Sequence, residues 1–241
     1  MKKNHISHWF SLLVISLLLQ SCQVFQDDRL HVSELKVEFI SEPVGLDVEF
    51  PRFSWIPESE KRGAAQSAYR ILVSNDLGQV EDLEGGLWDS GKVVSSETIN
   101  IRYVGPALQS NEDYYWRVHL WDELGKPSGW SDVQKFSTGL IHQGEWIGKW
   151  ISHPDSTVSA PLLRTEFDLD KPLESATAFV SGAGYYELYL NGVKVGDHVL
   201  DPALTDFRKR ILYETYDVTE LLQSGKNGIG FWLGNGALRV R

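Results

Sequence analysis

The sequence is short of cysteine, of basic charge and of long apolar runs. Cys22 is the only cysteine, so no disulfide can form within the chain. Acidic residues outnumber basic ones by 33 to 23, for a formal net charge of −10. This balance argues against nucleic acid as a partner, because phosphate binding needs a basic patch. The hydrophobic content of 42% is enough for an ordinary buried core.

Common catalytic motifs are also missing. The sequence contains no Gly-x-Ser-x-Gly elbow and no His-Glu-x-x-His, and its scattered histidines show no metal-ligand spacing. Glycoside hydrolysis needs two carboxyl groups that face each other across the sugar. Four acidic residues fall within one hairpin and the loop after it, namely Glu187, Asp197, Asp201 and Asp206. The simpler interpretation is turn and edge chemistry, with Asp206 paired to the basic run at 208–210. We therefore assign no catalytic residue.

The first 22 residues have the pattern of an export signal. Lys2 and Lys3 precede an apolar run from Phe10 to Leu19, which is too short to span a bilayer comfortably. The run ends at Leu19-Gln20-Ser21-Cys22, which resembles a bacterial lipobox, and this implies an acylated Cys22 followed by a tether over residues 23–31. We expect an exported protein, lipid-anchored at the outer membrane and either periplasmic or surface-exposed. The alternative is an ordinary secretory signal with an incidental cysteine.

Residues 32–139 show many short apolar segments separated by glycine and proline. No long helical period is present, so the pattern favours an all-β sandwich over an α/β fold. Leu108 precedes Tyr114 by six residues, which resembles the tyrosine corner of a fibronectin type III or immunoglobulin-like domain. Trp55 is the expected early core tryptophan. For Trp121 and Trp130 an exposed sugar platform is the alternative to a core position. Strands are expected at 35–39, 69–73, 100–104, 114–121 and 133–136.

Residues 145–241 predict a second sandwich. Asn191-Gly192 lies between two alternating apolar segments, which indicates a β-hairpin because both residues accept the positive φ angles of a tight turn. The expected architecture is a galactose-binding-like jelly roll, truncated by at least one late strand. Strands are expected at 163–169, 176–182, 185–190, 193–195, 211–216 and 229–233, with a short helix at 219–223.

A family resemblance covers most of the chain after residue 32. Residues 184–236 read GYYELYLNGVKVGDHVLDPALTDFRKRILYETYDVTELLQSGKNGIGFWLGNG and resemble the N-terminal β-sandwich domain of bacterial α-L-rhamnosidases. The resemblance implies the non-catalytic N-terminal portion of an enzyme that releases terminal α-L-rhamnose from glycans. Its acid and base would lie in an α-helical barrel further along, so this chain is expected to be inactive alone. The alternatives are a self-standing carbohydrate-binding surface lipoprotein and a structural spacer.

The resemblance also implies partners. These are a rhamnose-containing glycan, a membrane through the lipid anchor, and a downstream catalytic barrel. No cofactor is expected to be required, although some family members bind rhamnose through this domain with calcium. Calcium prefers oxygen ligands, and Asn191, Asp197 and Asp201 offer them close together in the sequence. These three residues are the predicted sugar or calcium site.

Overall fold

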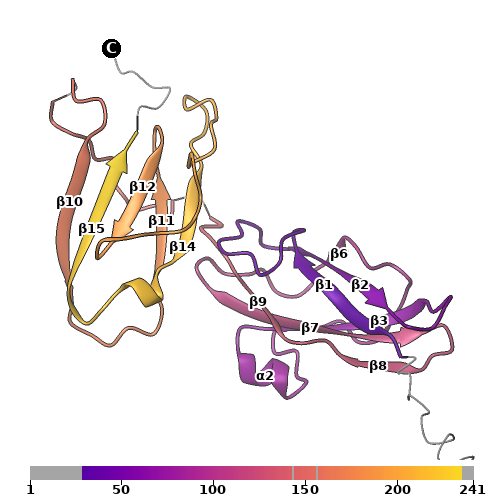
Figure 1. Ribbon diagram of the computed structural model, residues 1–241. Coiled ribbons are helices and arrows are strands. Elements are labelled where there is room, and N and C mark those ends of the chain that lie inside the picture. The colour runs from indigo at the N-terminus through magenta and orange to yellow at the C-terminus, as the bar shows by residue number, and fades with distance from the viewer. Residues whose placement is uncertain (1–28, 143, 156, 235–241) are drawn as a thin grey trace, which may run out of the picture.

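The structure is a computed structural model that describes residues 29–142, 144–155 and 157–234. It consists of two β-sandwiches in tandem, so the predicted all-β fold is confirmed (Figure 1). Cys22, the signal segment and most of the tether lie outside the described residues. Within the described part, no helix has the length and apolar character needed to cross a membrane.

The first sandwich packs a three-stranded sheet against a larger one. The smaller sheet has the order β1 (His31–Val37), β2 (Arg52–Glu58) and β6 (Ile101–Arg102). The larger has the order β4 (Trp88–Asp89), β3 (Gln66–Ser74), β7 (Asp113–Asp122) and β8 (Pro127–Trp130). β5 (Val93–Val94) also pairs with β3, β9 (Gln134–Ser137) pairs with β7, and the short helix α2 (Leu77–Glu81) follows β3.

Aromatic residues fill the core of this sandwich. Trp55 is 1% exposed, as predicted, and its indole Nε1–H donates a 2.9 Å hydrogen bond to Gln66 Oε1. Buried and half-buried residues alternate along β7, because successive side chains of a strand point to opposite sheet faces. The predicted tyrosine corner is also confirmed, since the Tyr114 hydroxyl accepts a 2.8 Å hydrogen bond from the backbone N–H of Gln109.

Trp121 and Trp130 lie on the outer face of the larger sheet. Both are half-buried, and neither belongs to the core. Lys92 Nζ lies 4.3 Å from the centre of the Trp121 ring, and the guanidinium carbons of Arg70 and Arg117 lie 5.6 and 5.5 Å from the Trp130 ring. These cation–π contacts occupy ring faces that a sugar would use. The core interpretation is wrong for both residues, and the sugar platform stays a prediction.

The second sandwich is thinner. One sheet has the order β10 (Leu162–Leu169), β15 (Gly225–Leu233), β12 (Tyr186–Leu190) and β13 (Val193–Lys194), while β11 (Thr177–Ser181) pairs with β14 (Tyr213–Asp217) in the other. The predicted hairpin is confirmed, with φ values of 51° at Asn191 and 85° at Gly192. The predicted short helix is a single 3₁₀ turn over Thr219–Leu221.

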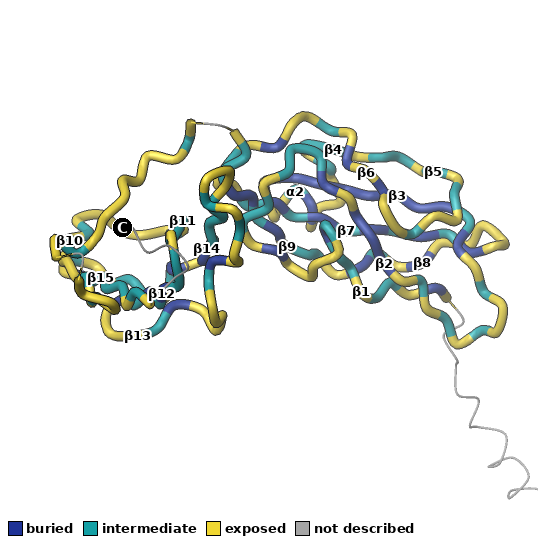
Figure 2. The backbone as a smooth tube through the Cα atoms, turned by 90° about the horizontal axis from the view of Figure 1, so that it is seen from above, coloured by how far each residue is buried: buried dark blue, intermediate teal, exposed yellow. Residues whose placement is uncertain are grey.

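Packing is less complete in this second sandwich. Figure 2 shows that the buried backbone is concentrated in the first sandwich. β15, which includes the strand expected at 229–233, pairs with β10 on one side and with β12 on the other. The missing late strand stays a prediction. Within the described residues, the smaller sheet of this sandwich has two strands, β11 and β14, against four in the other sheet.

The two sandwiches meet along β14. The backbone N–H of Leu140 donates a 2.8 Å hydrogen bond to the Tyr213 hydroxyl. Gly45 has a φ of +79°, and a Cβ atom at that position would overlap the side chain of Thr215. Tyr213 and Thr215 are two residues apart and therefore share one face of the strand. This interdomain seam leaves the opposite face of β14, with Glu214 and Tyr216, directed away from the first sandwich.

Candidate functional site

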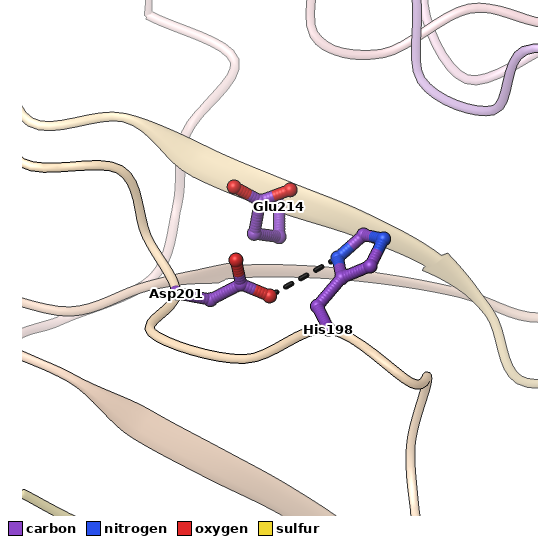
Figure 3. Close-up of side chains that lie close together, drawn as sticks. All are labelled: His198, Asp201 and Glu214. Atoms are coloured by element: carbon purple, nitrogen blue, oxygen red, sulfur yellow. Dashed lines mark hydrogen bonds and ion pairs between the residues drawn. The ribbon is translucent and has the colours of Figure 1, made fainter.

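Three side chains with metal-ligand chemistry converge at one end of the second sandwich. His198 and Asp201 come from the loop between β13 and β14, and Glu214 comes from β14 itself. One ligand atom from each side chain lies within 4.8 Å of those of the other two (Figure 3). We call these residues the His–Asp–Glu triad.

The loop is held in place by both sheets. The carbonyl of Asp201 accepts a 3.1 Å hydrogen bond from the backbone N–H of Tyr186, at the start of β12. The Tyr216 hydroxyl of β14 donates a 3.1 Å hydrogen bond to Asp201 Oδ2. Gly196 begins the loop with a φ of +71°, and a side chain there would crowd the Tyr216 ring. The carboxylate of Asp201 is thereby fixed between β12 and β14.

The electrostatics of the triad are unbalanced. His198 Nδ1 lies 3.0 Å from Asp201 Oδ2, and the Asp201 side chain is only 17% exposed. Glu214 is half-buried, and within the described residues its carboxylate forms no hydrogen bond or ion pair. Burial, and next the charge of Asp201, raise the pKa of Glu214, although His198 lowers it in part. Two carboxylates therefore share this corner with one imidazole.

The neighbouring tyrosines are neutral hydrogen-bonding groups. Burial raises the pKa of Tyr216 to about 12, and it raises the pKa of Tyr186 as well. Their hydroxyl oxygens lie 3.3 Å apart. The short chain from Tyr186 through Tyr216 to Asp201 keeps the aspartate oriented toward the triad. The arrangement is suited to holding a cation, with oxygen and nitrogen ligands from two elements.

The three residues predicted from the sequence have different surroundings. Asp201 belongs to the triad, and the neighbouring Asp197 is exposed outside it. The Asn191 side chain is engaged in structural hydrogen bonds. Its Nδ2 donates to the Leu221 carbonyl at 2.9 Å, and its Oδ1 accepts from the Gly228 N–H at 2.8 Å. These bonds join the hairpin turn to the 3₁₀ turn that ends at Leu221 and to β15. The calcium hypothesis stays a prediction.

Sequence reasoning missed His198 and Glu214. His198 stands three residues before Asp201, so the spacing alone contained a weak signal. Glu214 lies on β14, in the two-stranded sheet with β11, and no local sequence pattern connects it to the loop that carries His198 and Asp201. The simpler interpretation of the remaining carboxylates is supported, since Glu187 pairs with Lys194 at 2.9 Å and Asp206 with Arg208 at 3.0 Å.

A second feature is a groove of about 740 Å³ on the outer face of the four-stranded sheet. Its floor includes Gly228 and Gly230 of β15, and no atom lies within 4 Å of where a Cβ on Gly228 would be. Trp232, which is 52% exposed, and Tyr189 are among its lining residues, together with Asn191. The groove combines an open aromatic ring with polar neighbours.

Comparison with known families decides what kind of domains these are. Residues 32–142 match the model of the Rha78A-like N-terminal immunoglobulin domain. Residues 171–241 match the α-L-rhamnosidase N-terminal domain. Residues 171–241 belong to the α-L-rhamnosidase N-terminal domain family, and residues 32–142 to the Rha78A-like N-terminal immunoglobulin domains. The family resemblance read from the sequence is thus confirmed.

Individual α-L-rhamnosidases match over both sandwiches. One from Formosa agariphila is 36% identical over 253 residues, which cover 94% of this chain and 27% of the relative. The structure of α-L-rhamnosidase from Dictyoglumus thermophilum matches with a TM-score of 0.80 at 39% identity, over 86% of this chain and 25% of that one. The Aspergillus terreus enzyme matches with a TM-score of 0.72 at 29% identity, over 86% and 24%. The chain spans about a quarter of the length of these α-L-rhamnosidases.

Proposed function

We propose that this chain is the non-catalytic N-terminal portion of an α-L-rhamnosidase, in which the two sandwiches support a separate catalytic barrel. The observation that carries the proposal is the order of the matches, because both N-terminal domains of the family follow each other along one chain. The substrate of the whole protein would be a rhamnose-containing glycan, from which terminal α-L-rhamnose is released by hydrolysis.

The interdomain seam supports a scaffold role. Tyr213 and Thr215 on β14 contact Leu140 and Gly45 of the first sandwich. A pair of sandwiches joined by specific contacts can hold a neighbouring domain in one orientation, whereas a flexible link cannot. Three carboxylates of the β12–β13 hairpin and the loop after it also support a non-catalytic role. Glu187 and Asp206 form ion pairs with Lys194 and Arg208. Asp201 contacts His198 and accepts a hydrogen bond from Tyr216.

The test is an assay of residues 23–241 with an aryl α-L-rhamnoside. We expect no turnover above buffer. Turnover that is abolished by Asp201→Asn or Glu214→Gln would overturn the proposal, because it would place an acid/base pair in this chain. Reading the gene beyond Arg241 supplies the complementary check. An in-frame helical barrel domain is expected there, and its absence would favour a self-standing binding protein.

The outer groove favours a second function, the binding of sugar by the second sandwich. The half-exposed ring of Trp232 offers an apolar surface on which a pyranose can stack, and Tyr189 lines the same groove. Calorimetric titration with L-rhamnose tests this. Trp232→Ala should weaken binding at least tenfold, while Trp150→Ala, another exposed tryptophan outside the groove, should leave it unchanged. Absence of binding by the unaltered chain would leave scaffolding as the role.

We further propose that the protein is exported and lipid-anchored through Cys22. The support is sequence alone: a basic start, a short apolar run and a lipobox-like Leu-Gln-Ser-Cys. An acylated cysteine would hold both sandwiches at a membrane surface, where they meet extracellular or periplasmic glycans.

A further inference from the structure

We propose that the His–Asp–Glu triad is a binding site for a zinc-class divalent cation, which fastens the loop between β13 and β14 to β14. The ligands are an imidazole nitrogen of His198 and one carboxylate oxygen each from Asp201 and Glu214. The proposal is independent of the rhamnosidase assignment, since it concerns only this corner of the second sandwich.

The distances suit a shared cation. Zinc ligands lie about 2.0–2.2 Å from the metal, so two ligand atoms on one ion are separated by at most about 4.4 Å. The three ligand atoms already lie within 4.8 Å of one another, before any ion draws them together. His198 is on a loop and its side chain is 53% exposed, so it can close the remaining gap without disturbing either sheet.

The negative charge of the two carboxylates in the triad also favours a bound cation. Glu214 is on the face of β14 opposite the seam, half-buried and without a hydrogen-bonding or ionic partner among the described residues. Lys194 is a cationic side chain that contacts the loop between β13 and β14, and its Nζ pairs with Glu187 at 2.9 Å and lies 3.4 Å from the His198 carbonyl oxygen. An ion held between Asp201 and Glu214 removes their repulsion and supplies the missing partner.

The chemistry of the ligands selects the class of metal. Calcium takes six to eight oxygen ligands, and an imidazole nitrogen is foreign to that set. One nitrogen and two carboxylate oxygens suit zinc and its neighbours among the divalent transition metals. Tyr216 supports this set from outside, because its hydroxyl donates to Asp201 Oδ2 and orients that carboxylate. A water molecule can complete a four-coordinate site.

The experiment is calorimetric titration of the full chain with Zn²⁺, with thermal unfolding measured in parallel. We expect one site whose affinity falls at least tenfold in His198→Ala and in Glu214→Gln. Asp197→Asn is the matched control, since it removes a carboxylate from the same loop, one residue from His198, and outside the triad. It should bind Zn²⁺ as the unaltered protein does. Zn²⁺ should also raise the unfolding temperature of the unaltered protein and of Asp197→Asn only.

Three results would overturn the proposal. The first is the absence of a Zn²⁺ site, and the second is a site that survives both His198→Ala and Glu214→Gln, which would locate the metal at other histidines or at Cys22. The third is a Ca²⁺ site of higher affinity than Zn²⁺ that is indifferent to His198→Ala, which would indicate an oxygen-ligand calcium site instead. His198→Gln serves as a second variant if the alanine variant is poorly folded.

Discussion

The hydroxyl of Tyr213 accepts a 2.8 Å hydrogen bond from the backbone N–H of Leu140, and this bond joins the segment after β9 of the first sandwich to β14 of the second. The Trp146 ring lies 5.9 Å from the Tyr213 ring, centre to centre, on the linker between the sandwiches. One tyrosine therefore contacts the end of one domain and the linker that follows it.

Tyr213→Phe should loosen this seam without unfolding either sandwich. The substitution keeps the ring and removes the acceptor, so the expected cost is about 1 kcal/mol. Hydrogen exchange at the Leu140 amide should become faster. Tyr189→Phe is the control, because Tyr189 lines the outer groove and its hydroxyl donates to Glu187, away from the seam. Unchanged protection at Leu140 in Tyr213→Phe would show that the bond does not hold the domains together.

Tyr114→Phe should destabilise the first sandwich. The lost hydroxyl leaves the Gln109 N–H without its acceptor, and the expected loss is about 1–3 kcal/mol of unfolding free energy. Urea denaturation followed by tryptophan fluorescence measures it. Tyr115→Phe, on the opposite face of β7, should change stability by much less. Equal effects from the two variants would contradict a tyrosine corner that contributes to stability.

The second sandwich should open before the first. Its buried cluster is much smaller among the described residues, and its second sheet has only β11 and β14 there. Fewer buried apolar contacts mean lower local stability. Hydrogen exchange of the full chain should therefore show weaker protection in β11 and β14 than in β3 and β7. Equal protection in both pairs would mean that the second sandwich is as stable as the first.

Glu214→Gln should stabilise the metal-free protein at neutral pH. The folded-state pKa of Glu214 is raised above its ordinary value of 4.5 by burial and by Asp201, so the folded state holds this proton more tightly than the unfolded chain. The free energy of unfolding therefore falls as the pH rises from the ordinary pKa of Glu214 through its raised folded-state pKa. At neutral pH the destabilisation by the ionised Glu214 carboxylate is fully present.

Replacing the Glu214 carboxyl group with an amide removes this destabilisation. The gain should stay below about 1 kcal/mol, because the site is partly open to solvent, which screens the charges. Thermal unfolding with a chelator at pH 7 and at pH 4 checks it. The gain should be present at pH 7 and largely absent at pH 4, and the reverse order would show that Glu214 is stabilised as a carboxylate.

Cys22 should carry acyl chains when the protein is expressed in a bacterium. Fatty-acid labelling in growing cells, followed by membrane fractionation, measures this. Cys22→Ser is the control and should remove the label. A soluble product that begins at another residue and carries no label would instead indicate an ordinary secretory signal.

Much of the fold follows from local sequence. Asn191-Gly192 predicts its hairpin because the positive φ angles belong to those two residues themselves. Leu108 and Tyr114 predict a sandwich corner because the hydrogen bond closes over a short span, from Tyr114 to Gln109. The family resemblance was equally accessible, since it rests on a continuous run of residues.

Only the tertiary structure decided the neighbours of β15, the seam and the triad. β15 is a central strand because β10 and β12 pair with its two edges, and strand order is not written in the periodicity of any one strand. Glu214 meets His198 and Asp201 only when β14 is packed so that one of its faces contacts Gly45 and Leu140 and the other the loop. Sequence patterns report which face a residue occupies, whereas contacts between separate sheets depend on how those sheets are packed.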